Sequence, residues 1–426
     1  MDVMHRCCAG LDVHKESVTA CVRTLGDVGK VSVEVREFST MTGGILAMRD
    51  WLVDAGVSHV AMEATGVYWK PIWNLLEDGF ELMLCNARHV RNVPGRKTDV
   101  NDSQWLAQLL QHGLLSPSFV PPRPQRDLRD MTRHRTQLTG EKTRVANRLQ
   151  KVLEDANIKL ASVASDILGK SGRRMLTAMA NGENDPAKLA DLALRKLRAK
   201  LADLEQAFEG GLSPHHRYML DKLLRHLEFI EQEIEDLDQR IEAQIGSEEL
   251  NAHVDEDNAL PFDQAVELLC TAPGIDRTTA YAIVAEIGTD MDQFPTAANL
   301  ASWTGLCPGN NESAGKRKSG RTTHGNRWLK RALSQSAWAA SHTKNTHLSV
   351  RYRQLSKRRG RKRAVVALAH SLCTSIHAML RTHAPYFELG PDHRDTIAPE
   401  RRAKYLKKQL QKLGYKVEIQ PVQEAA

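Results

Sequence analysis

The chain has 426 residues, of which 41% are hydrophobic and 26% are charged, and its formal net charge is +7. These proportions are those of a globular protein and exclude a disordered or fibrous chain, while the length allows two or three domains. The chain lacks a basic-then-apolar start and no apolar run approaches ~18 residues, so we expect a cytoplasmic protein without a membrane partner. The seven cysteines form no CxxC pair and no zinc spacing, which predicts free thiols.

The first part of the chain, 1–120, alternates strand-like and helix-like segments. We predict strands and helices in the order β-β-β-α-β-α-β-α, at 6–13, 17–23, 31–38, 44–55, 58–63, 68–78, 81–86 and from 99 to about 112. Three consecutive strands favour an antiparallel meander, and the alternation that follows favours parallel pairing with helical crossovers. This α/β order is the order of an RNase H-like domain.

A proline cluster at 117–124 indicates a linker, because proline lacks an N–H and disfavours helix in the residue before it. The next region, 126–255, is predicted to be helical and contains a coiled-coil seam. Its apolar residues, spaced 4, 3, 4, 3 and 4 apart, are Leu223, Leu227, Ile230, Ile234, Leu237 and Ile241. The seam fits either an intramolecular helical hairpin or dimerisation, and we favour dimerisation.

A third region, 260–390, is predicted to be helical with glycine-bearing turns, and a charged tail follows at 391–426. Within it, 268–288 predicts a helix, a Pro-Gly turn and a second helix. Such a helix-hairpin-helix-like segment either presents backbone N–H groups to a phosphate or forms a tight αα-corner. The sequence leaves both interpretations open, and Asp276 stands where a phosphate-binding turn often has glycine.

The positive charge is local. The stretch 316–363 contains 16 Lys and Arg and no acid, whereas 1–120 contains 11 Lys and Arg and 14 acids. A cationic segment of this kind suits the phosphate backbone of nucleic acid, although a solvated helix surface is the simpler alternative. The predicted nucleic-acid-binding residues are Lys316, Arg317, Lys318, Arg321, Arg327, Arg358, Arg359 and Arg361.

Four acids form the candidate metal site. Asp12 and Glu63 stand near the ends of predicted strands, and Asp99 and Asp102 share one face at the start of a predicted helix. Strand ends and a helix start can meet at one sheet edge, and converging carboxylates suit Mg²⁺ in phosphodiester chemistry. Taken singly, Asp99 fits a helix cap and Glu63 fits a buried, paired acid.

A serine follows in the third region, within NNESAGKRKSGRTTHGN. Small residues after Ser313 allow close backbone approach, and its cationic neighbours suit a developing pentacoordinate phosphate. A serine in such a loop is ordinarily a polar turn residue, and Ser319 is its nearest competitor as a nucleophile.

The segments GLDVHK, AMEATGVYW and KTDVNDSQWLAQLL resemble the DEDD motif of the bridge-RNA-guided insertion-sequence recombinases, the "IS one-ten" family, which is related to Piv-type DNA invertases. The resemblance runs from about residue 6 to about residue 391. It implies a RuvC-like first domain in which Asp12, Glu63, Asp99 and Asp102 bind Mg²⁺. It also implies that Ser313 matches the serine that forms a covalent phosphoserine link to DNA.

The leading interpretation is therefore a transposase that cuts and religates target and donor DNA. The resemblance further implies a bridge RNA and a homo-oligomer, dimer or tetramer, in which the acids of one protomer meet the serine of another. The alternatives are an invertase with protein-read sites, a hydrolytic RuvC-like nuclease with a structural Ser313, and a non-catalytic nucleic-acid-binding coiled-coil protein.

Overall fold

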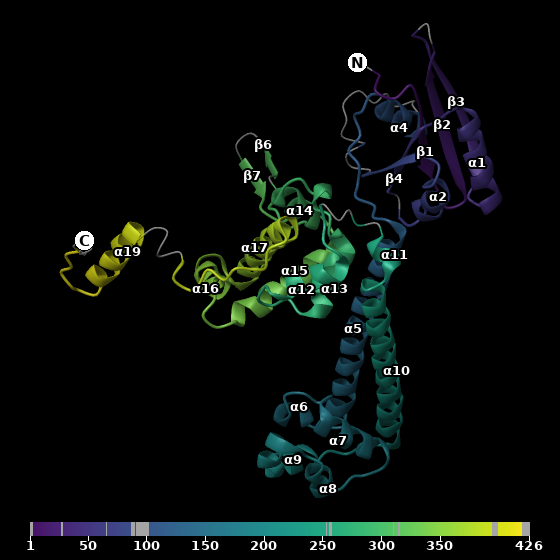
Figure 1. The fold of residues 1–426 in the computed structure, drawn as a ribbon. Helices are drawn as coiled ribbons and strands as arrows, with labels where there is room; N and C mark the ends of the chain where they lie inside the picture. Colours follow the sequence, from purple (N-terminus) through teal and green to yellow (C-terminus); the bar gives the residue numbers. More distant parts are fainter. Residues whose placement is uncertain are drawn as a thin grey trace. The chain divides into compact units, whose positions relative to one another are not determined.

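The computed structural model describes residues 3–26, 29–64, 66–86, 90, 102–252, 254, 258–309, 311–313, 316–393 and 399–419. The chain divides into two compact units, Met1–Pro121 and Pro122–Ala426 (Figure 1). The boundary lies inside the proline cluster.

The first unit is built on a five-stranded mixed sheet. Its strands are β1 (Cys7–Val13), β2 (Ser17–Leu25), β3 (Val31–Ser39), β4 (His59–Glu63) and β5 (Glu81–Cys85). The strand order is β3-β2-β1-β4-β5, with β1, β2 and β3 antiparallel to one another and β1, β4 and β5 parallel. The predicted meander followed by parallel crossovers is confirmed, as is the RNase H-like arrangement.

Helices cover both faces of this sheet. Alternate residues of β1, including Leu11 and Val13, pack with α1 (Thr42–Asp54) and α2 (Trp69–Leu76). The residues between them face the other way, where Cys8 shares a core with α4 (Asp102–Gln111). This separation follows from the two-residue period of a strand.

The second unit begins with a long helical hairpin made of α5 (Arg123–Asp155) and α10 (Pro214–Ile245), which lie side by side (Figure 1). Short helices close its far end: α6 (Leu160–Val163), α7 (Lys170–Ala180), α8 (Pro186–Asp191), the 3-10 helix η1 (Arg195–Lys200) and α9 (Leu201–Ala207).

The heptad seam of α10 packs against α5 of the same chain. Leu223, Leu227 and Ile230 are buried in one core with Leu149 and other apolar residues of α5. The intramolecular hairpin is therefore the packing that the structure shows, and dimerisation through this seam, the interpretation favoured from the sequence, is not seen. An apolar seam specifies a partner helix but not the chain that supplies it.

The rest of the unit is largely helical, as predicted, but it also carries a small two-stranded sheet. The strands are β6 (Asn311–Ser313) and β7 (Lys316–Ser319). The helices are α11 (Glu248–Asn251), α12 (Phe262–Cys270), α13 (Arg277–Ile287), η2 (Met291–Gln293), α14 (Ala297–Thr304), α15 (Arg327–His342), α16 (His347–Arg359), α17 (Arg361–Thr382) and α19 (Pro399–Lys412).

Helix α17 is the central helix of this region and packs against α12, α14, α15 and α16. Of the helices that the structure describes, it is the one that is long and apolar enough to cross a membrane. More than half of its apolar window, 56%, is buried inside the protein, which is the pattern of a core helix.

The turn between α12 and α13 forms a tight corner against α15. Gly274 has φ of +83°, and a Cβ there would lie 2.4 Å from the carbonyl oxygen of Ser336. Asp276 caps α13, because its Oδ1 accepts a hydrogen bond from the Thr279 N–H at 2.8 Å. The backbone of this turn therefore packs on protein, which favours the αα-corner interpretation over phosphate binding.

Candidate functional site

Two of the predicted acids stand on neighbouring parallel strands. β1 and β4 are paired up to Leu11 and Met62, and the next residues along each strand are Asp12 and Glu63. Both acids belong to the alternate set of residues that includes Cys8 and Ala61, which face α4. The two carboxylates therefore lie on one face of the sheet, at the carboxyl ends of the neighbouring strands β1 and β4.

A glycine brings α4 against this face. A Cβ on Gly10 would lie 2.4 Å from both the Ala107 nitrogen and the Ser103 carbonyl oxygen, so only glycine allows this approach of strand and helix. The Cys8 Sγ donates to the Ala107 carbonyl oxygen at 3.5 Å. Cys8 therefore lies beside Ala107 and Gly10 beside Ser103, so α4 runs in the direction opposite to β1. Its first residue, Asp102, is at the end of the helix that is nearer to Asp12.

The surroundings of the two strand acids are polar and partly open. Asp12 is 22% exposed, and its Oδ2 lies 3.3 Å from Nε2 of the exposed His14. Glu63 is half-buried and pairs in register with Cys85. Burial raises the pKa of the Cys85 thiol to about 12, and the charge of Glu63 adds to this rise. Cys85 is therefore a neutral thiol, and like the other six cysteines it is free, as predicted.

The fourth acid, Asp99, lies outside the described residues, so its predicted place on the same helix face as Asp102 is not seen. Among the residues that the structure describes, no group of three or more His, Cys, Asp or Glu is arranged to hold a metal ion. Asp12, Glu63 and Asp102 nevertheless offer the carboxylate oxygens that hard divalent cations prefer. The donor chemistry of these three side chains fits such an ion.

Ser313 lies at the end of β6, where its backbone pairs with Lys316 of β7. The predicted loop is therefore a β-hairpin. A hydrogen bond closes the open end of the hairpin: the N–H of Gly309, before β6, donates to the carbonyl oxygen of Arg321, after β7, at 2.8 Å. The competing Ser319 has a local role, since its Oγ accepts from the Arg321 N–H at 3.2 Å.

The predicted nucleic-acid-binding residues lie on the serine hairpin, between it and the start of α15, and at the α16–α17 junction. The side chains of Arg317 and Lys318 lie outside the described set. The remaining six are all exposed: Lys316, Arg321, Arg327, Arg358, Arg359 and Arg361.

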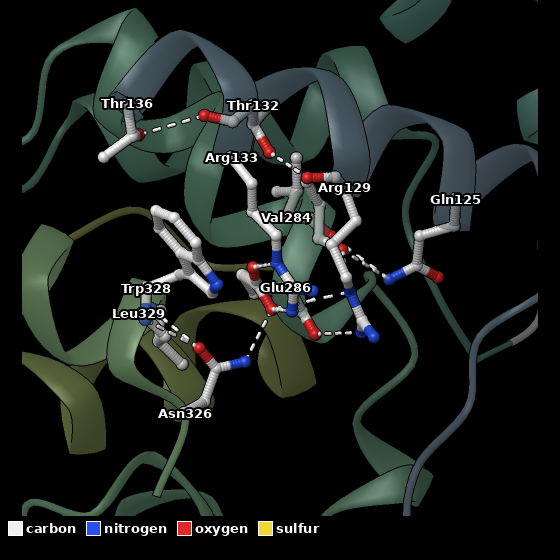
Figure 2. Close-up of polar contacts among 11 residues, drawn as sticks. Gln125, Arg129, Thr132, Arg133, Thr136, Val284, Glu286, Asn326, Trp328 and Leu329 are labelled. Atoms are coloured by element: carbon white, nitrogen blue, oxygen red, sulfur yellow. Dashed lines mark hydrogen bonds and ion pairs between the residues drawn. The ribbon is translucent and has the colours of Figure 1, made fainter. Parts of the chain in front are cut away.

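The segment after β7 is anchored by a buried carboxylate. Figure 2 shows Glu286 of α13 between Arg129 and Arg133 of α5 and Asn326, which caps α15. Glu286 is 1% exposed and accepts from Arg133 Nε and Nη2 at 2.6 and 2.8 Å. The Asn326 side chain donates to Glu286 Oε2 at 2.5 Å, the oxygen that also accepts from Arg133 Nη2. A buried acid requires such partners, because an unpaired charge is costly in the interior.

Arg129 completes the anchor. Its Nε lies 3.4 Å from the Glu286 carboxylate, and its Nη2 donates to the Glu286 carbonyl oxygen at 2.6 Å. Burial lowers the pKa of Arg129 to about 10, and the Glu286 charge opposes this change. The guanidinium therefore remains charged at neutral pH, and we call Arg129, Arg133, Glu286 and Asn326 the Glu286 cluster.

Sequence reasoning missed both Gly10 and the Glu286 cluster. A glycine inside a strand is a signal of close backbone approach, so Gly10 was detectable. An acid in the apolar run AYAIVAEIG signals a buried pair, but its arginine partners are 153 and 157 residues away and cannot be read from the pattern.

Comparison with known proteins agrees with this geometry. A family model of DEDD transposases, described as "Transposase", matches residues 9–158, and a model described as "Transposase IS116/IS110/IS902 family" matches residues 266–353. Together they cover more than half of the chain, including all four acids and Ser313. The chain belongs to the IS110 family of DEDD transposases.

Two relatives support this membership. The transposase for insertion sequence element IS1111A of Coxiella burnetii is 26% identical over 337 residues, covering 78% of this chain and 79% of the relative. An uncharacterized protein of insertion element IS110 from Streptomyces coelicolor is 33% identical over 121 residues, covering 27% of this chain and 28% of the relative. This transposase is thus an enzyme that acts on DNA, and its DEDD motif implies divalent metals.

Proposed function

We propose that this transposase cuts and rejoins target and donor DNA through a covalent phosphoserine at Ser313, with Asp12, Glu63, Asp99 and Asp102 holding Mg²⁺. The observation that carries the proposal is the placement of Asp12 and Glu63 on adjacent parallel strands, on the face where α4 begins with Asp102. Carboxylates gathered in this way suit phosphodiester chemistry.

In the cleavage step, a bond forms between Ser313 Oγ and phosphorus while the bond from phosphorus to the 3′-oxygen of the strand breaks. The Oγ proton is lost and the departing 3′-oxygen gains one. A 3′-hydroxyl of the strand to be joined then attacks the phosphoserine and restores the serine. Asp12, Glu63, Asp99 and Asp102 would hold the divalent cation, which when bound would stabilise the charge on the attacking and leaving oxygens. Lys316 and Arg321 supply positive charge beside the serine.

We further propose a bridge RNA and a homo-oligomer as partners, and a cytoplasmic location. The bridge RNA supplies sequence choice through base pairing, which suits an exposed cationic surface that reads backbone charge. The acids and the serine belong to separate compact units, which suits a dimer or tetramer that combines them from different protomers. Because α5 occupies the heptad seam, such an oligomer forms through other surfaces.

A suicide-substrate assay tests the chemistry. Purified protein, Mg²⁺, RNA transcribed from the element's flanks and nicked, labelled target DNA are combined and separated on a denaturing protein gel. We expect an RNA-dependent protein–DNA adduct that is lost in Ser313→Ala and Asp12→Ala. The matched control is Ser319→Ala, which removes the neighbouring hydroxyl and should leave the adduct intact.

Each other outcome identifies an alternative. An adduct that forms equally without RNA would indicate an invertase-like enzyme that reads its sites with protein. Cleaved DNA without an adduct, unchanged in Ser313→Ala, would indicate a hydrolytic nuclease and would overturn the proposal.

A further inference from the structure

Helix α15 carries an exposed stripe that the proposed chemistry does not use. The stripe consists of side chains at intervals of three or four residues, all of them exposed: Arg327, Arg331, Gln335, Trp338 and His342. Residues with this spacing lie on one face of a helix. At ~1.5 Å per residue the stripe is about 22 Å long, the length of about six stacked nucleotides at ~3.4 Å each.

Trp338 is the unusual member, because tryptophan side chains are highly buried on average in folded proteins. Its side chain is 48% exposed. The His342 ring lies 4.6 Å from it at 66°, and the Tyr352 ring lies 6.2 Å from it at 88°. Neither neighbour therefore stacks parallel on the indole, while both hold it in place from the side. A fixed, exposed indole offers a planar face to a nucleobase.

The start of the stripe is cationic and continues into a cleft. Arg327 lies over the Trp328 ring at 4.6 Å, and Arg133 of α5 approaches the same ring at 5.9 Å. Arg331 and Gln335 line the cleft between α5, α13 and α15, together with hydroxyls such as that of Thr136 and with Glu286, whose charge is paired with Arg129 and Arg133. No acid occurs in the sequence from 316 to 363. Cations beside aromatic rings are the combination that binds single strands, through phosphates and bases respectively.

We propose that the α15 stripe binds an unpaired DNA strand, with Trp338 stacked on a base and Arg327 and Arg331 on phosphates. The choice of DNA rests on the proposed Ser313 chemistry. Helix α15 begins eight residues after β7 of the serine hairpin, and Arg327 is the first residue of the stripe after that hairpin along the chain. Trp338 lies about 16 Å further along the helix axis at ~1.5 Å per residue.

Binding titrations with labelled single-stranded DNA test the stripe. The full chain carrying Ser313→Ala is used, so that covalent capture does not contribute to the signal. Trp338→Ala should weaken binding roughly tenfold without changing the salt dependence, because stacking releases no counterions. Trp338→Phe should retain most of the affinity. Arg331→Ala should weaken binding and lower the slope of log affinity against log salt by about 0.7.

Matched controls lie elsewhere on the same unit. Phe229→Ala removes an aromatic ring that is 62% exposed on α10, and Arg174→Ala removes an exposed cation on α7. Neither should change binding. Equal affinity of Trp338→Ala and its parent, an equal loss on duplex DNA, or tighter binding of RNA of the same sequence would each overturn the proposal.

This measurement is independent of cleavage. Loss of the Ser313 adduct with an intact Trp338 effect would count against the serine chemistry alone. Adduct formation at the full rate in Trp338→Ala, with unchanged strand binding, would count against the stripe alone.

Discussion

The acid site and the serine hairpin are positioned by different kinds of interaction. Asp12, Glu63 and Asp102 are placed by apolar packing, through paired strands and a helix that approaches the sheet over Gly10. Ser313 lies on a short hairpin in a strongly cationic region, and the segment that follows it is held by the buried charges of the Glu286 cluster. Steric changes should therefore disturb the positioning of the acids, and changes of charge should disturb the positioning of the segment that follows the serine hairpin.

The largest expected effect comes from the acids themselves. Asp12→Asn keeps the size of the side chain but removes a charged oxygen ligand. We expect adduct formation to fall on the order of 1,000-fold, because charge stabilisation by a metal is worth several kcal/mol. A chelator added to the unsubstituted enzyme should have the same effect, reversed by Mg²⁺. Asp50→Asn, at a 66% exposed acid of the same unit, is the control. Normal adduct formation by Asp12→Asn would contradict the metal assignment.

The charged anchor can be broken by Glu286→Gln. The substitution leaves Arg129 and Arg133 without their carboxylate, which should cost about 3 kcal/mol of unfolding free energy. Chemical denaturation monitored by circular dichroism measures this cost, and limited proteolysis should show earlier cutting near Asn326. Glu242→Gln, at a 67% exposed acid of α10, should change neither. A change below about 0.5 kcal/mol at Glu286 would show that the cluster is not a stabilising anchor.

The steric contrast is tested by Gly10→Ala. Its new Cβ would lie 2.4 Å from two backbone atoms of α4, so the helix must move, and we expect a loss of about 2 kcal/mol. Because Asp102 moves with α4, adduct formation should fall as well. In Gly43→Ala the new Cβ meets no atom within 4 Å, so stability should be unchanged or slightly higher. If the two variants behaved alike, close approach at Gly10 would not position the helix.

The smallest effect concerns the polar face of the helical hairpin. Desolvation raises the pKa of Glu231, but hydrogen bonds from Lys142 and Arg173 outweigh it, so the pKa is lowered overall. An acid with a lowered pKa in the folded state stabilises the protein above its unfolded pKa, and this contribution is lost as pH falls through the folded pKa. We expect Glu231→Gln to have an unfolding free energy less than about 1 kcal/mol below that of the unsubstituted protein at pH ~7. This difference between the two proteins should disappear on acidification. Thermal melts between pH ~7 and pH ~3 would detect this difference.

The acid site was the more predictable of the two regions. The two-residue period of the strands and the alternation of elements identified the sheet, and its parallel edge brought Asp12 and Glu63 together. The serine region was less predictable because its contacts join distant parts of the chain. Glu286 meets Arg133 across 153 residues, and nothing in an apolar periodicity indicates which helix covers Leu227 or leaves Trp338 exposed.

Helix α5 is also a lever. It spans 33 residues, which is about 50 Å at ~1.5 Å per residue, and Arg129 and Arg133 sit within its first three turns. The Glu286 cluster is therefore close to the amino-terminal end of α5, and the helices α6 to α9 pack near its carboxy-terminal end. The far end of α5 lies about 35 Å from the cluster, so a tilt of about 6° at the cluster moves that end by about 4 Å. A small rotation at the Glu286 cluster would therefore become a larger displacement of α6 to α9, at the far end of the helical hairpin.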